Sequence, residues 1–471
     1  MERGERRLWG CLLGIAVALA AGLLFPARGW AQEVPKAKKV VLDLKQAVKL
    51  AVVVSPEVKQ FRAGVAGAEA KKDQADAGRF PQFDLTSVLG PSPRARFTED
   101  AEGRSSIATT ASITKPAIDG IFGRAEFTLV QPLYTFGKIS SLREAARQGV
   151  KVEQARTDEK TSEIVLRTKK LYYDLLLAQE IKGLVADIEE QLEKTLEKVE
   201  RQLEAGAPGA DEVDRYKLRT FRGELKKGIA ELEKGTDLAR EALKTLVGLQ
   251  PDQELELADK VLQPAERPVV EVEKAVAEAK ELRPEFAQIR AGLLATQALV
   301  EATRADFYPQ IFVAVDGDYA RATNRSFMKN PFLIDVFNHN ALAPLLGFKW
   351  HFDFGITSGR VAAARAELLK LEHTKEFAEK GIPLQVVKAH RELKEAQEAI
   401  KATEEGYLNA RRWLVAAVAN FDLGIGEAKD VADALTAYGR LRADNFRAIY
   451  NFNLSLANLD HATGRDVAEA K

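Results

Sequence analysis

The sequence is short of the residues that carry out thiol and metal chemistry. Its 471 residues include one cysteine, Cys11, and five histidines. Because Cys11 lies in the first apolar run, the rest of the chain has no thiol, which excludes disulfides, thiol catalysis and cysteine-rich metal sites there. His351, His373, His390 and His461 lack the spacing of metal ligands. We therefore expect no enzyme and no cofactor.

The chain also lacks an excess of charge of either sign. Lysine and arginine together number 69, and so do aspartate and glutamate. A chain without a net field has no general attraction for nucleic acid, so we expect no nucleic-acid partner. With 29% charged and 46% hydrophobic residues, the composition is that of a folded protein.

Long apolar runs are absent after the N-terminal region. No later segment approaches the roughly 18 uninterrupted apolar residues that a membrane-spanning helix requires. The N-terminal run follows several arginines and ends in small residues, which is typical of a secretory signal peptide. We predict a signal peptide over residues 1–31, cleaved after Ala31, with an uncleaved anchor helix as the alternative. Cys11 begins this run instead of following it, so we expect no attached lipid.

The sequence contains an internal duplication. The segment PEVKQFRAG, which begins at Pro56, returns as PEFAQIRAG at Pro284. A second pair, Pro132–Arg147 and Trp350–Arg365, shares Phe-Gly, a serine and Ala-Ala-Arg at the same spacing. Each copy is predicted to contain a helix, a strand, a loop, a strand, a long helix, a turn and a helix. We predict a first repeat (32–250), a proline-containing linker (251–270), a second repeat (271–464) and a C-terminal tail (465–471).

Two long helical hairpins are predicted, one in each copy. Lys138–Leu203 contains no proline, and its apolar residues recur at steps of three and four, as in coiled coils. At about 1.5 Å per residue this helix is roughly 100 Å long, too long for a compact helical core, which is the ordinary alternative. The chain turns at Glu204–Glu212 and returns as a second helix. The second copy repeats this hairpin: its long helix is predicted over Gly359–Phe421, with a kink expected at Pro383, and the returning helix ends at about Thr463. The first stripe consists of Ile181, Val185, Ile188, Leu192, Leu196, Val199 and Leu203.

Beyond the Pro-Gln pair of each copy, the hydrophobic period changes to two, the period of a β-strand. The clearest case is Phe348–Phe354, where four aromatic residues share one face and Lys349, His351 and Asp353 share the other. Each such run is about the nine to eleven residues that a tilted strand needs to cross a bilayer. The pattern favours a membrane barrel, with a soluble sandwich as the alternative. The other three runs are Gln82–Leu89, Ala125–Leu133 and Gln310–Tyr319.

Four strands cannot close a barrel, and an open strand edge in lipid leaves backbone groups without partners. We therefore expect the chain to share its barrel with copies of itself. Two copies would give eight strands with a plugged bore, whereas three would give twelve and leave room for water. The polar stretches Gly90–Gly120 and Arg321–Asn340 are expected to be exterior loops.

With these features the chain resembles the TolC-type outer-membrane efflux proteins. The likeness runs from Leu42 to Gly464, and its marks are the Pro-Gln pairs, QPLYTFGK before the long helix and LYYDLLLAQE (Leu171–Glu180) within it. It implies a mixed α/β homotrimer with a shared 12-stranded β-barrel in the outer membrane and a long coiled-coil tunnel in the periplasm. It also implies docking on a periplasmic adaptor protein and an inner-membrane pump, as the exit duct of a tripartite efflux or type I secretion system.

The resemblance implies a gate at the periplasmic end of the second hairpin. Counted from Gly424, Asp430 and Asp433 match the paired aspartates of the family's constriction, and Glu212 stands where the first hairpin often has an acidic partner. Three chains would bring six aspartates around the axis, which would select cations and be blocked by multivalent ones. The alternative is that the two aspartates complement the dipole of the helix that they open.

The sequence departs from the family's pattern at one latch of the gate. The family has a tyrosine three residues before the second-tip glycine and an arginine two residues after it, where this chain has Phe421 and Gly426. These residues cannot form that hydrogen-bonded link. We count Phe421 among the gate residues and consider Arg411, Arg412 and Arg440 as candidates for a replacement link.

The tips of the two hairpins are the expected contact for the adaptor protein. Gly206 and Ala207 in the first tip, and Gly424 and Ile425 in the second, stand where the family presents a glycine followed by an apolar residue. The rival function is that of a periplasmic coiled-coil adaptor or scaffold. Such a protein would carry one hairpin, whereas this chain has two.

Overall fold

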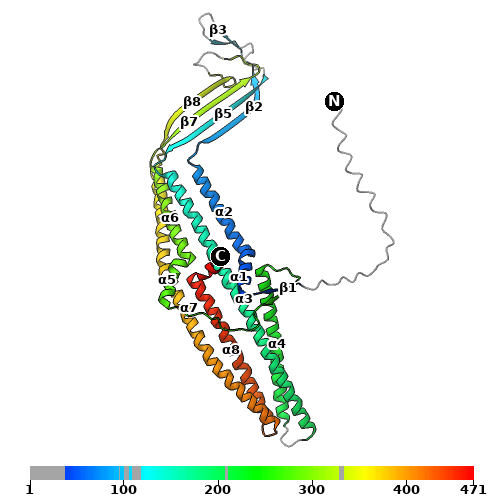
Figure 1. The fold of residues 1–471 in the computed structure, drawn as a ribbon. Helices are drawn as coiled ribbons and strands as arrows, with labels where there is room; N and C mark the ends of the chain where they lie inside the picture. Colours follow the sequence, from blue (N-terminus) through cyan, green and yellow to red (C-terminus); the bar gives the residue numbers. More distant parts are fainter. Residues whose placement is uncertain are drawn as a thin grey trace, which may run out of the picture.

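The structure is a computed structural model that describes residues 38–94, 96–99, 105–108, 118–206, 211–327 and 334–470. The predicted signal peptide and Ala207 lie outside these residues. The described chain is elongated, with a β-sheet at one end and the tips of two helical hairpins at the other (Figure 1). Within these residues, none of the helices has both the length and the apolar character needed to span a membrane.

The two copies contain matching elements in the same order. The helices α1 and α5 have 11 residues each, α3 and α7 have 67 each, and α4 and α8 have 36 each. The first copy consists of α1 (Leu44–Val54), α2 (Pro56–Ala77), β2 (Gln82–Pro93), β5 (Ile118–Tyr134), α3 (Lys138–Glu204) and α4 (Glu212–Val247). The second consists of α5 (Val272–Leu282), α6 (Pro284–Arg304), β7 (Gln310–Ala322), β8 (His339–Lys349), α7 (Ile356–Asp422) and α8 (Ala428–Thr463).

Short elements connect or extend the two copies. A small antiparallel pair, β3 with β4, lies within the segment predicted as the first exterior loop. The predicted linker contains a strand, β6, and the predicted tail contains a helix, α9, so both segments include secondary structure. These elements and a short 3₁₀ helix are β1 (Lys38–Leu42), β3 (Arg96–Glu99), β4 (Ser105–Ala108), β6 (Gln253–Leu257), η1 (Ala305–Phe307) and α9 (Arg465–Ala470).

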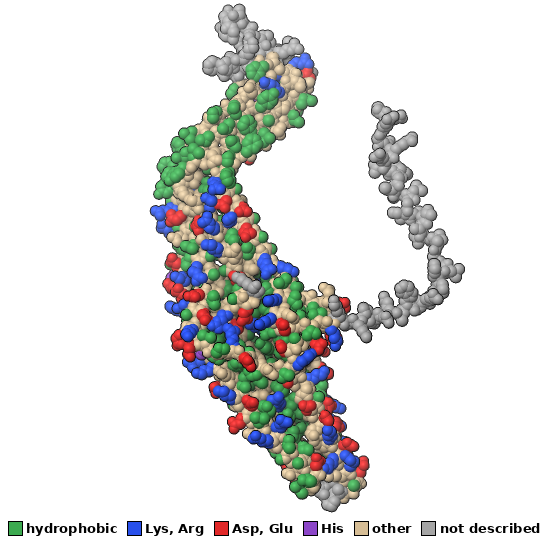
Figure 2. All heavy atoms as spheres, in the orientation of Figure 1, with side chains coloured by type: hydrophobic (Ala, Val, Ile, Leu, Met, Phe, Trp, Pro, Cys, Tyr) green, Lys and Arg blue, Asp and Glu red, His purple; other side chains and the backbone are tan. Residues whose placement is uncertain are grey.

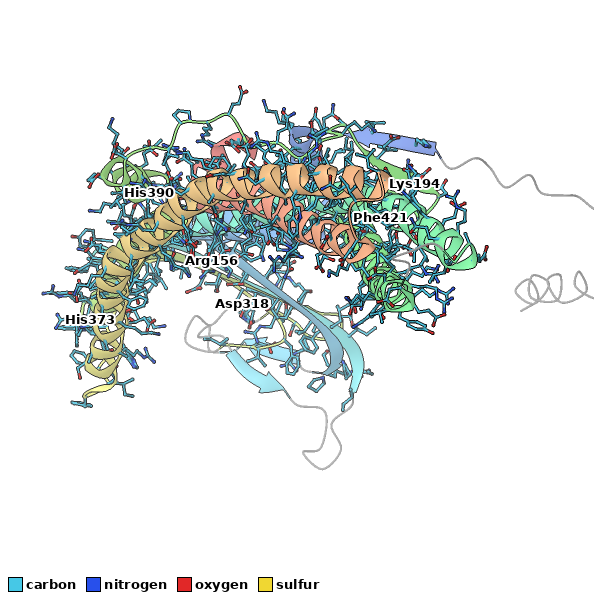
Figure 3. The ribbon with its side chains drawn as sticks, turned by 90° about the horizontal axis from the view of Figure 1, so that it is seen from below. Arg156, Lys194, Asp318, His373, His390 and Phe421 are labelled. Carbon is cyan, nitrogen blue, oxygen red and sulfur yellow. The ribbon has the colours of Figure 1, made fainter. Side chains whose placement is uncertain are left out.

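Local sequence explains where the helices begin and where α7 bends. Asp43 and Gln46 form a capping box at α1, with the Gln46 N–H donating to the Asp43 carboxylate at 2.7 Å. The helices α2 and α6 both begin with a proline, because the first helical position needs no N–H donor. Pro383 lies inside α7, and the helix changes direction between His373 and His390, as predicted (Figure 3).

The predicted stripe of α3 packs against both hairpins. Ile188, Leu192, Leu196 and Val199 are buried, and they form a cluster with apolar residues of α4, α7 and α8. This cluster joins the first hairpin to the second over the half of the molecule that ends at the tips.

The strands β2, β5, β7 and β8 form one antiparallel sheet in that order. Residues paired directly across strands lie on the same face, so the register sorts the side chains into two faces. In Figure 2, apolar side chains gather over the strands, and charged ones over the helices. One face has the pairs Phe83–Leu129, Leu85–Phe127, Ile311–Phe348 and Val313–Leu346. The other has the pairs Thr86–Glu126, Asp84–Thr128, Glu126–Asp318 and Thr128–Asp316.

The segment with the clearest alternation does not form the strand predicted for it. Only the first two residues of Phe348–Phe354 belong to β8, which starts earlier, inside the segment predicted as an exterior loop. The strand ends at Lys349, and the chain then enters α7, where the Asp353 carboxylate accepts the backbone N–H of Thr357 at 2.9 Å. Phe354 has a φ of 47°, which turns the chain out of the sheet. The alternation therefore continues past the strand that it predicts.

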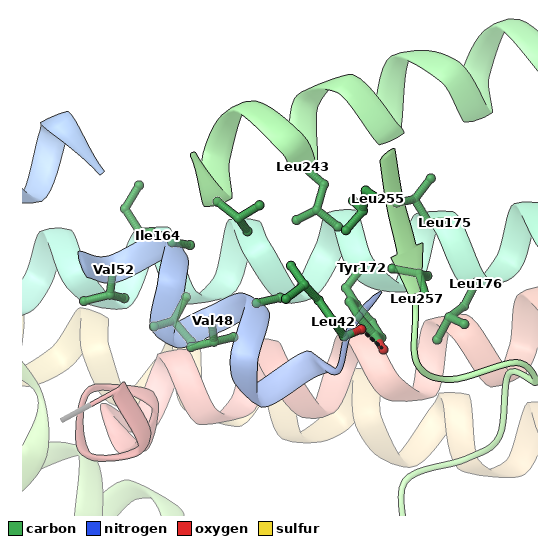
Figure 4. Packing of buried hydrophobic residues seen from close by; sticks show 14 of the residues in the cluster. Leu42, Val48, Val52, Ile164, Tyr172, Leu175, Leu176, Leu243, Leu255 and Leu257 are labelled. Atoms are coloured by element: carbon green, nitrogen blue, oxygen red, sulfur yellow. Dashed lines mark hydrogen bonds between the residues drawn. The ribbon is translucent and has the colours of Figure 1, made fainter. Parts of the chain in front are cut away.

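A second apolar cluster lies midway along the molecule (Figure 4). Here β1 pairs in parallel with β6, which ties the start of the first copy to the linker. Tyr172 is fully buried, and its hydroxyl donates to Asp259 at 2.7 Å and lies 3.4 Å from the Leu42 carbonyl oxygen. Burial, and next the hydrogen bond to Asp259, raises the pKa of Tyr172 well above its ordinary value.

The helix α9 is held on α3 by a 2.6 Å hydrogen bond from the Ser162 hydroxyl to the Asp466 carboxylate.

Candidate functional site

The second face of the sheet carries a charged network that joins three strands. Arg124 of β5 donates from Nε to Asp318 of β7 at 3.1 Å and also contacts Glu126. His339 of β8 lies with its Nε2 3.2 Å from the Asp318 carboxylate. Asp318 is labelled in Figure 3. A charged face backed by an apolar face is the arrangement of a strand that separates water from lipid.

At the other end of the molecule, each hairpin turns at a glycine in the left-handed conformation. Gly206 has a φ of 62° and Gly424 a φ of 77°, values at which a side chain would be strained. In the second tip, the Gly424 N–H donates to the Phe421 carbonyl at 3.2 Å, and the Ile425 N–H to the Asn420 carbonyl at 3.0 Å. These bonds satisfy the last carbonyls of α7 and close the helix sharply.

The two tips meet at a cavity of about 200 Å³ whose lining comes from both hairpins. Asp211 and Asp214 line it from the first tip, and Glu427 from the second. Burial raises the pKa of Asp214, and the charges of Asp211 and Glu427 act in the same direction, while Lys217 and Lys429 oppose them. The ionisation of the first tip is thus coupled to the charge of the second.

Lys198 of α3 links the first hairpin to the end of α7. Its Nζ donates to the Phe421 carbonyl and to the Asp422 carboxylate, both at 3.0 Å, and lies 4.6 Å from the centre of the Phe421 ring. An ammonium is favoured at a helix C-terminus and over an aromatic face, so the three contacts reinforce one another. Phe421 is only 6% exposed and packs in the cluster between the hairpins. The structure therefore places this predicted gate residue behind the tip surface.

The predicted carboxylates lie on the surfaces of the tips. Asp430 is in the first turn of α8 and Asp433 one turn later, and both are exposed, whereas Val431 between them is buried. Their spacing of three residues puts them side by side on the helix, and Asp430 also lies where it complements the helix dipole. Glu212 opens α4 and is held by Arg215 of its own helix at 3.1 Å. Over the described residues, no group of three or more His, Cys, Asp or Glu side chains is arranged to hold a metal ion.

The second tip presents apolar side chains to its surroundings. Leu423 and Ile425 flank Gly424, and each is 75% exposed. A Cβ built on Gly424 would meet no atom within 4 Å, so the space around this turn is open. In the first tip, Gly206 is described, and Ala207 lies outside the described residues. Exposed apolar residues at a loop tip favour a contact surface for another protein.

Sequence reasoning missed Lys198 and Asp214. Lys198 directly precedes Val199 of the buried stripe, and Asp214 lies one turn before Leu218, where the returning stripe begins. A charged residue that flanks a buried stripe position was the available signal. Of the arginines considered for a replacement latch, Arg412 bonds to Asn409 of its own helix, and within this chain Lys198 also links the two hairpins.

A model of a known protein family matches this chain. The family model described as "Outer membrane efflux protein" matches residues 47–249 and 275–465, which is most of the chain. The chain belongs to the outer membrane efflux protein family. The two matched segments correspond to the two copies of the duplication, and membership assigns the chain to the outer membrane, with the helical part in the periplasm. The family is one of transport channels, which favours the channel over the periplasmic adaptor. No curated protein sequence matches the chain.

Solved structures of outer-membrane channels share the fold of this family member. The CmeC channel of Campylobacter jejuni superposes with a TM-score of 0.72 at 14% identity, covering 89% of this chain and 85% of that one. VceC of Vibrio cholerae gives 0.70 at 17% identity, covering 89% and 96%. The open-state MtrE channel of Neisseria gonorrhoeae gives 0.67 at 17% identity, covering 89% and 88%. The predicted TolC-like fold is confirmed.

Proposed function

We propose that three copies of this chain form the exit duct of a tripartite efflux system, through which substrates leave the periplasm across the outer membrane. The observation that carries this proposal is the four-stranded sheet, which has an apolar face, a charged face and, among the described residues, a free outer edge on each of β2 and β8. Pairing β8 of one copy with β2 of the next would satisfy both edges. The apolar face then contacts lipid and the charged face encloses water.

The size of the assembly follows from the strand count. Each chain contributes four strands, so two copies give a barrel whose bore is filled by side chains, whereas three give a twelve-stranded barrel with an aqueous bore. The hairpins of three chains would continue the tube into the periplasm over the roughly 100 Å length of α3 and α7. A periplasmic adaptor and an inner-membrane pump complete the tripartite system, and we infer that the adaptor binds the tips at Leu423 and Ile425.

Asp430 and Asp433 are the residues that we assign to the constriction of this duct. They are exposed neighbours on α8 beside the tip, so a threefold ring would carry six aspartates around a narrow axis. Close carboxylates resist joint ionisation and attract cations, which makes the constriction cation-selective. Lys198 and Phe421 hold the two hairpins together behind this surface.

The duct is tested by reconstituting the purified protein. We expect a trimer by mass measurement in detergent and cation-selective single-channel currents in planar bilayers. A monomer that gives no current, whether or not it binds lipid, would overturn the proposed duct.

The constriction is tested by block of these currents. Changing Asp430 and Asp433 to alanine is expected to reduce block by trivalent cations at least tenfold, because the ring of carboxylates that binds them is lost. Asp444→Ala serves as the matched control, since Asp444 lies further along α8 and pairs with Arg447 at 3.2 Å. Unchanged block in the double variant would remove the assignment and leave the duct itself in place.

A further inference from the structure

A cavity of about 650 Å³ lies midway along the molecule, where α1, α8 and α9 pack on α3 (Figure 1). Its volume is within the range of roughly 300–1,000 Å³ that is typical of small-molecule sites. The apolar part of its wall comes from α1 and α8 and consists of Leu44, Val48, Leu456 and Ala457. The polar part consists of Lys45, Lys49, Lys169, Tyr173, Glu266, Arg267, Asn453, Asp460 and Glu469.

The deep polar side of this cavity is satisfied by the chain itself. Asp460 is only 3% exposed, and Arg267 Nη1 donates to both oxygens of its carboxylate at 2.8 Å. Lys169 donates to Glu469 at 2.8 Å and lies 3.7 Å from Asp460. Asn453 is bonded on both sides to the backbone of the predicted linker at 2.9 Å. These bonds join α3, α8, α9 and the linker into a fixed wall.

The mouth of the cavity, in contrast, carries donors without partners. Lys45 and Lys49 are exposed one turn apart on α1, and in the described part of the chain neither side chain forms an ion pair or a hydrogen bond. The Tyr173 hydroxyl likewise has no hydrogen-bond partner among these residues. Burial raises the pKa of Tyr173 to about 12, and nearby carboxylates add to the increase, so the hydroxyl keeps its proton and can donate.

The charges that remain in the lining favour an anion over a cation. The two unpaired lysines repel each other at this spacing, and an anion between them removes the repulsion. Glu266 is the carboxylate of the lining that has no ion pair within the described residues, so a cation would meet one free carboxylate beside two ammonium groups. The unpaired charge at the cavity is therefore positive.

We propose that this cavity binds a small amphipathic anion, with its apolar body against Leu44 and Leu456 and its carboxylate or phosphate between Lys45 and Lys49. Ammonium groups bind either head group through charge-assisted hydrogen bonds, and the Tyr173 hydroxyl donates a further bond. Because lysine acts as a point charge, it accepts both head groups. The site lies apart from the tips and from the proposed constriction, so it does not depend on the duct.

The site is tested by calorimetric titration of the full-length protein in a nonionic detergent. The probes are 1-naphthyl phosphate, 1-naphthoate, 1-naphthol and inorganic phosphate, each corrected for the heat of titration into detergent alone. We expect at least one of the two naphthyl anions to bind, and the stronger one identifies the head group. Naphthol and inorganic phosphate should bind at least about tenfold more weakly, because each lacks one of the two parts that the cavity contacts. Binding of neither naphthyl anion, or equal binding of all four probes, would overturn the proposal.

Three variants locate the binding. The double variant Lys45→Met and Lys49→Met should weaken binding of the preferred anion at least about tenfold, and both positions are exposed, so the helical circular dichroism should not change. Tyr173→Phe keeps the ring and should weaken binding a few-fold. Lys39→Met is the matched control, since Lys39 is an exposed lysine of β1 that lines a different cavity, and it should change the affinity by less than about twofold.

Two outcomes with these variants would contradict the site. One is unchanged affinity in the double lysine variant, and the other is an equal loss in Lys39→Met, which would indicate a general effect of surface charge. Ion currents of the double variant should equal those of the parent. A failure of binding therefore leaves the duct in place, and a failure of the duct appears in the currents and not in the calorimetry.

Discussion

The two hairpins have helices of equal length, yet they bury very different parts of their surface. The helix α8 buries side chains from its first residue, Ala428, to its last, Thr463. The helix α4 buries only Leu218 near its start and, near its end, Leu243, Lys244 and Val247. The reason is position, because α8 packs against both α7 and α3, whereas α4 lies on the outer side of α3 (Figure 1). The helices α4 and α8 share a helical hydrophobic period, yet they bury different numbers of side chains because their neighbours differ.

The helices α4 and α7 lie at the borders of the helical part, just as the strands β2 and β8 lie at the edges of the sheet. Phe377, Leu384 and Val415 on α7 are apolar and exposed, as expected where a second copy would pack. The sheet likewise ends in β2 and β8, each of which pairs with a neighbouring strand on one side only within the described residues. The exposed apolar residues of α7 and the edges of the sheet are therefore surfaces that a neighbouring copy of the chain would cover.

The largest effect is expected from a core residue of α8, which buries more side chains than α4 does. Leu435 of α8 is 1% exposed between the hairpins, while Leu225 of α4 is half-buried at the border of the same cluster. Leu435→Ala leaves a cavity and should lower the free energy of unfolding by about 2–5 kcal/mol. Leu225→Ala should cost about half as much, since its site is already open to water. Denaturant unfolding followed by helical circular dichroism measures both, and equal losses would contradict the contrast between α8 and α4.

A smaller change in stability, with a large change in current, is expected at Lys198. Lys198→Met keeps the length of the side chain but removes the ammonium that holds Phe421 and Asp422. The hairpins should then separate more readily, which raises the open fraction in single-channel recordings several-fold and lowers the free energy of unfolding by about 1 kcal/mol.

Lys194→Met is the matched control for this variant. Lys194 lies one turn earlier on α3 and pairs with Glu190 of its own helix at 2.6 Å, so it does not join the hairpins (Figure 3). If both variants change the current alike, the contact of Lys198 is not what holds the hairpins together.

Elements with a long, regular period could be predicted from the sequence. The first long helix is predicted over Lys138–Leu203 and spans Lys138–Glu204, because many turns repeat one stripe. A strand has fewer residues to average over, and Phe348–Phe354 keeps alternating after the strand has ended. Alternation does not reveal that α7 begins there, with the Asp353 carboxylate accepting the Thr357 N–H in its first turn.

The contacts behind the tips could not be predicted from local patterns. Lys198 and Phe421 are 223 positions apart, and their contact depends on how the two hairpins cross. Asp430 and Asp433 are singled out by the family resemblance, counted from Gly424, and both lie on α8. Their role in a constriction depends on three chains meeting, so it stays a prediction that the block experiment tests.

The smallest effect concerns the coupling between the charges of the two tips. Burial, together with Asp211 and Glu427, raises the pKa of Asp214 above the ordinary value of 3.8. The protonated carboxyl therefore favours the folded state at low pH, and this stabilisation is lost as the pH rises through the raised pKa. In the Asp214→Asn variant there is no carboxyl to ionise, so this loss of stability does not occur. At neutral pH the variant should therefore be more stable than the parent by less than about 1 kcal/mol, and the difference should vanish below the ordinary pKa of Asp214. Thermal melting as a function of pH measures it.

Two further variants separate coupling from simple burial. Glu212→Gln changes an exposed carboxylate on the same tip, where Arg215 already holds it, so it should not reproduce the pH dependence. In a Glu427→Gln background, the gain from Asp214→Asn should become smaller, because one of the charges that raises the pKa of Asp214 has been removed from the second tip. An unchanged gain would mean that the tips titrate independently, and the hairpins would then be joined by packing and by Lys198 alone.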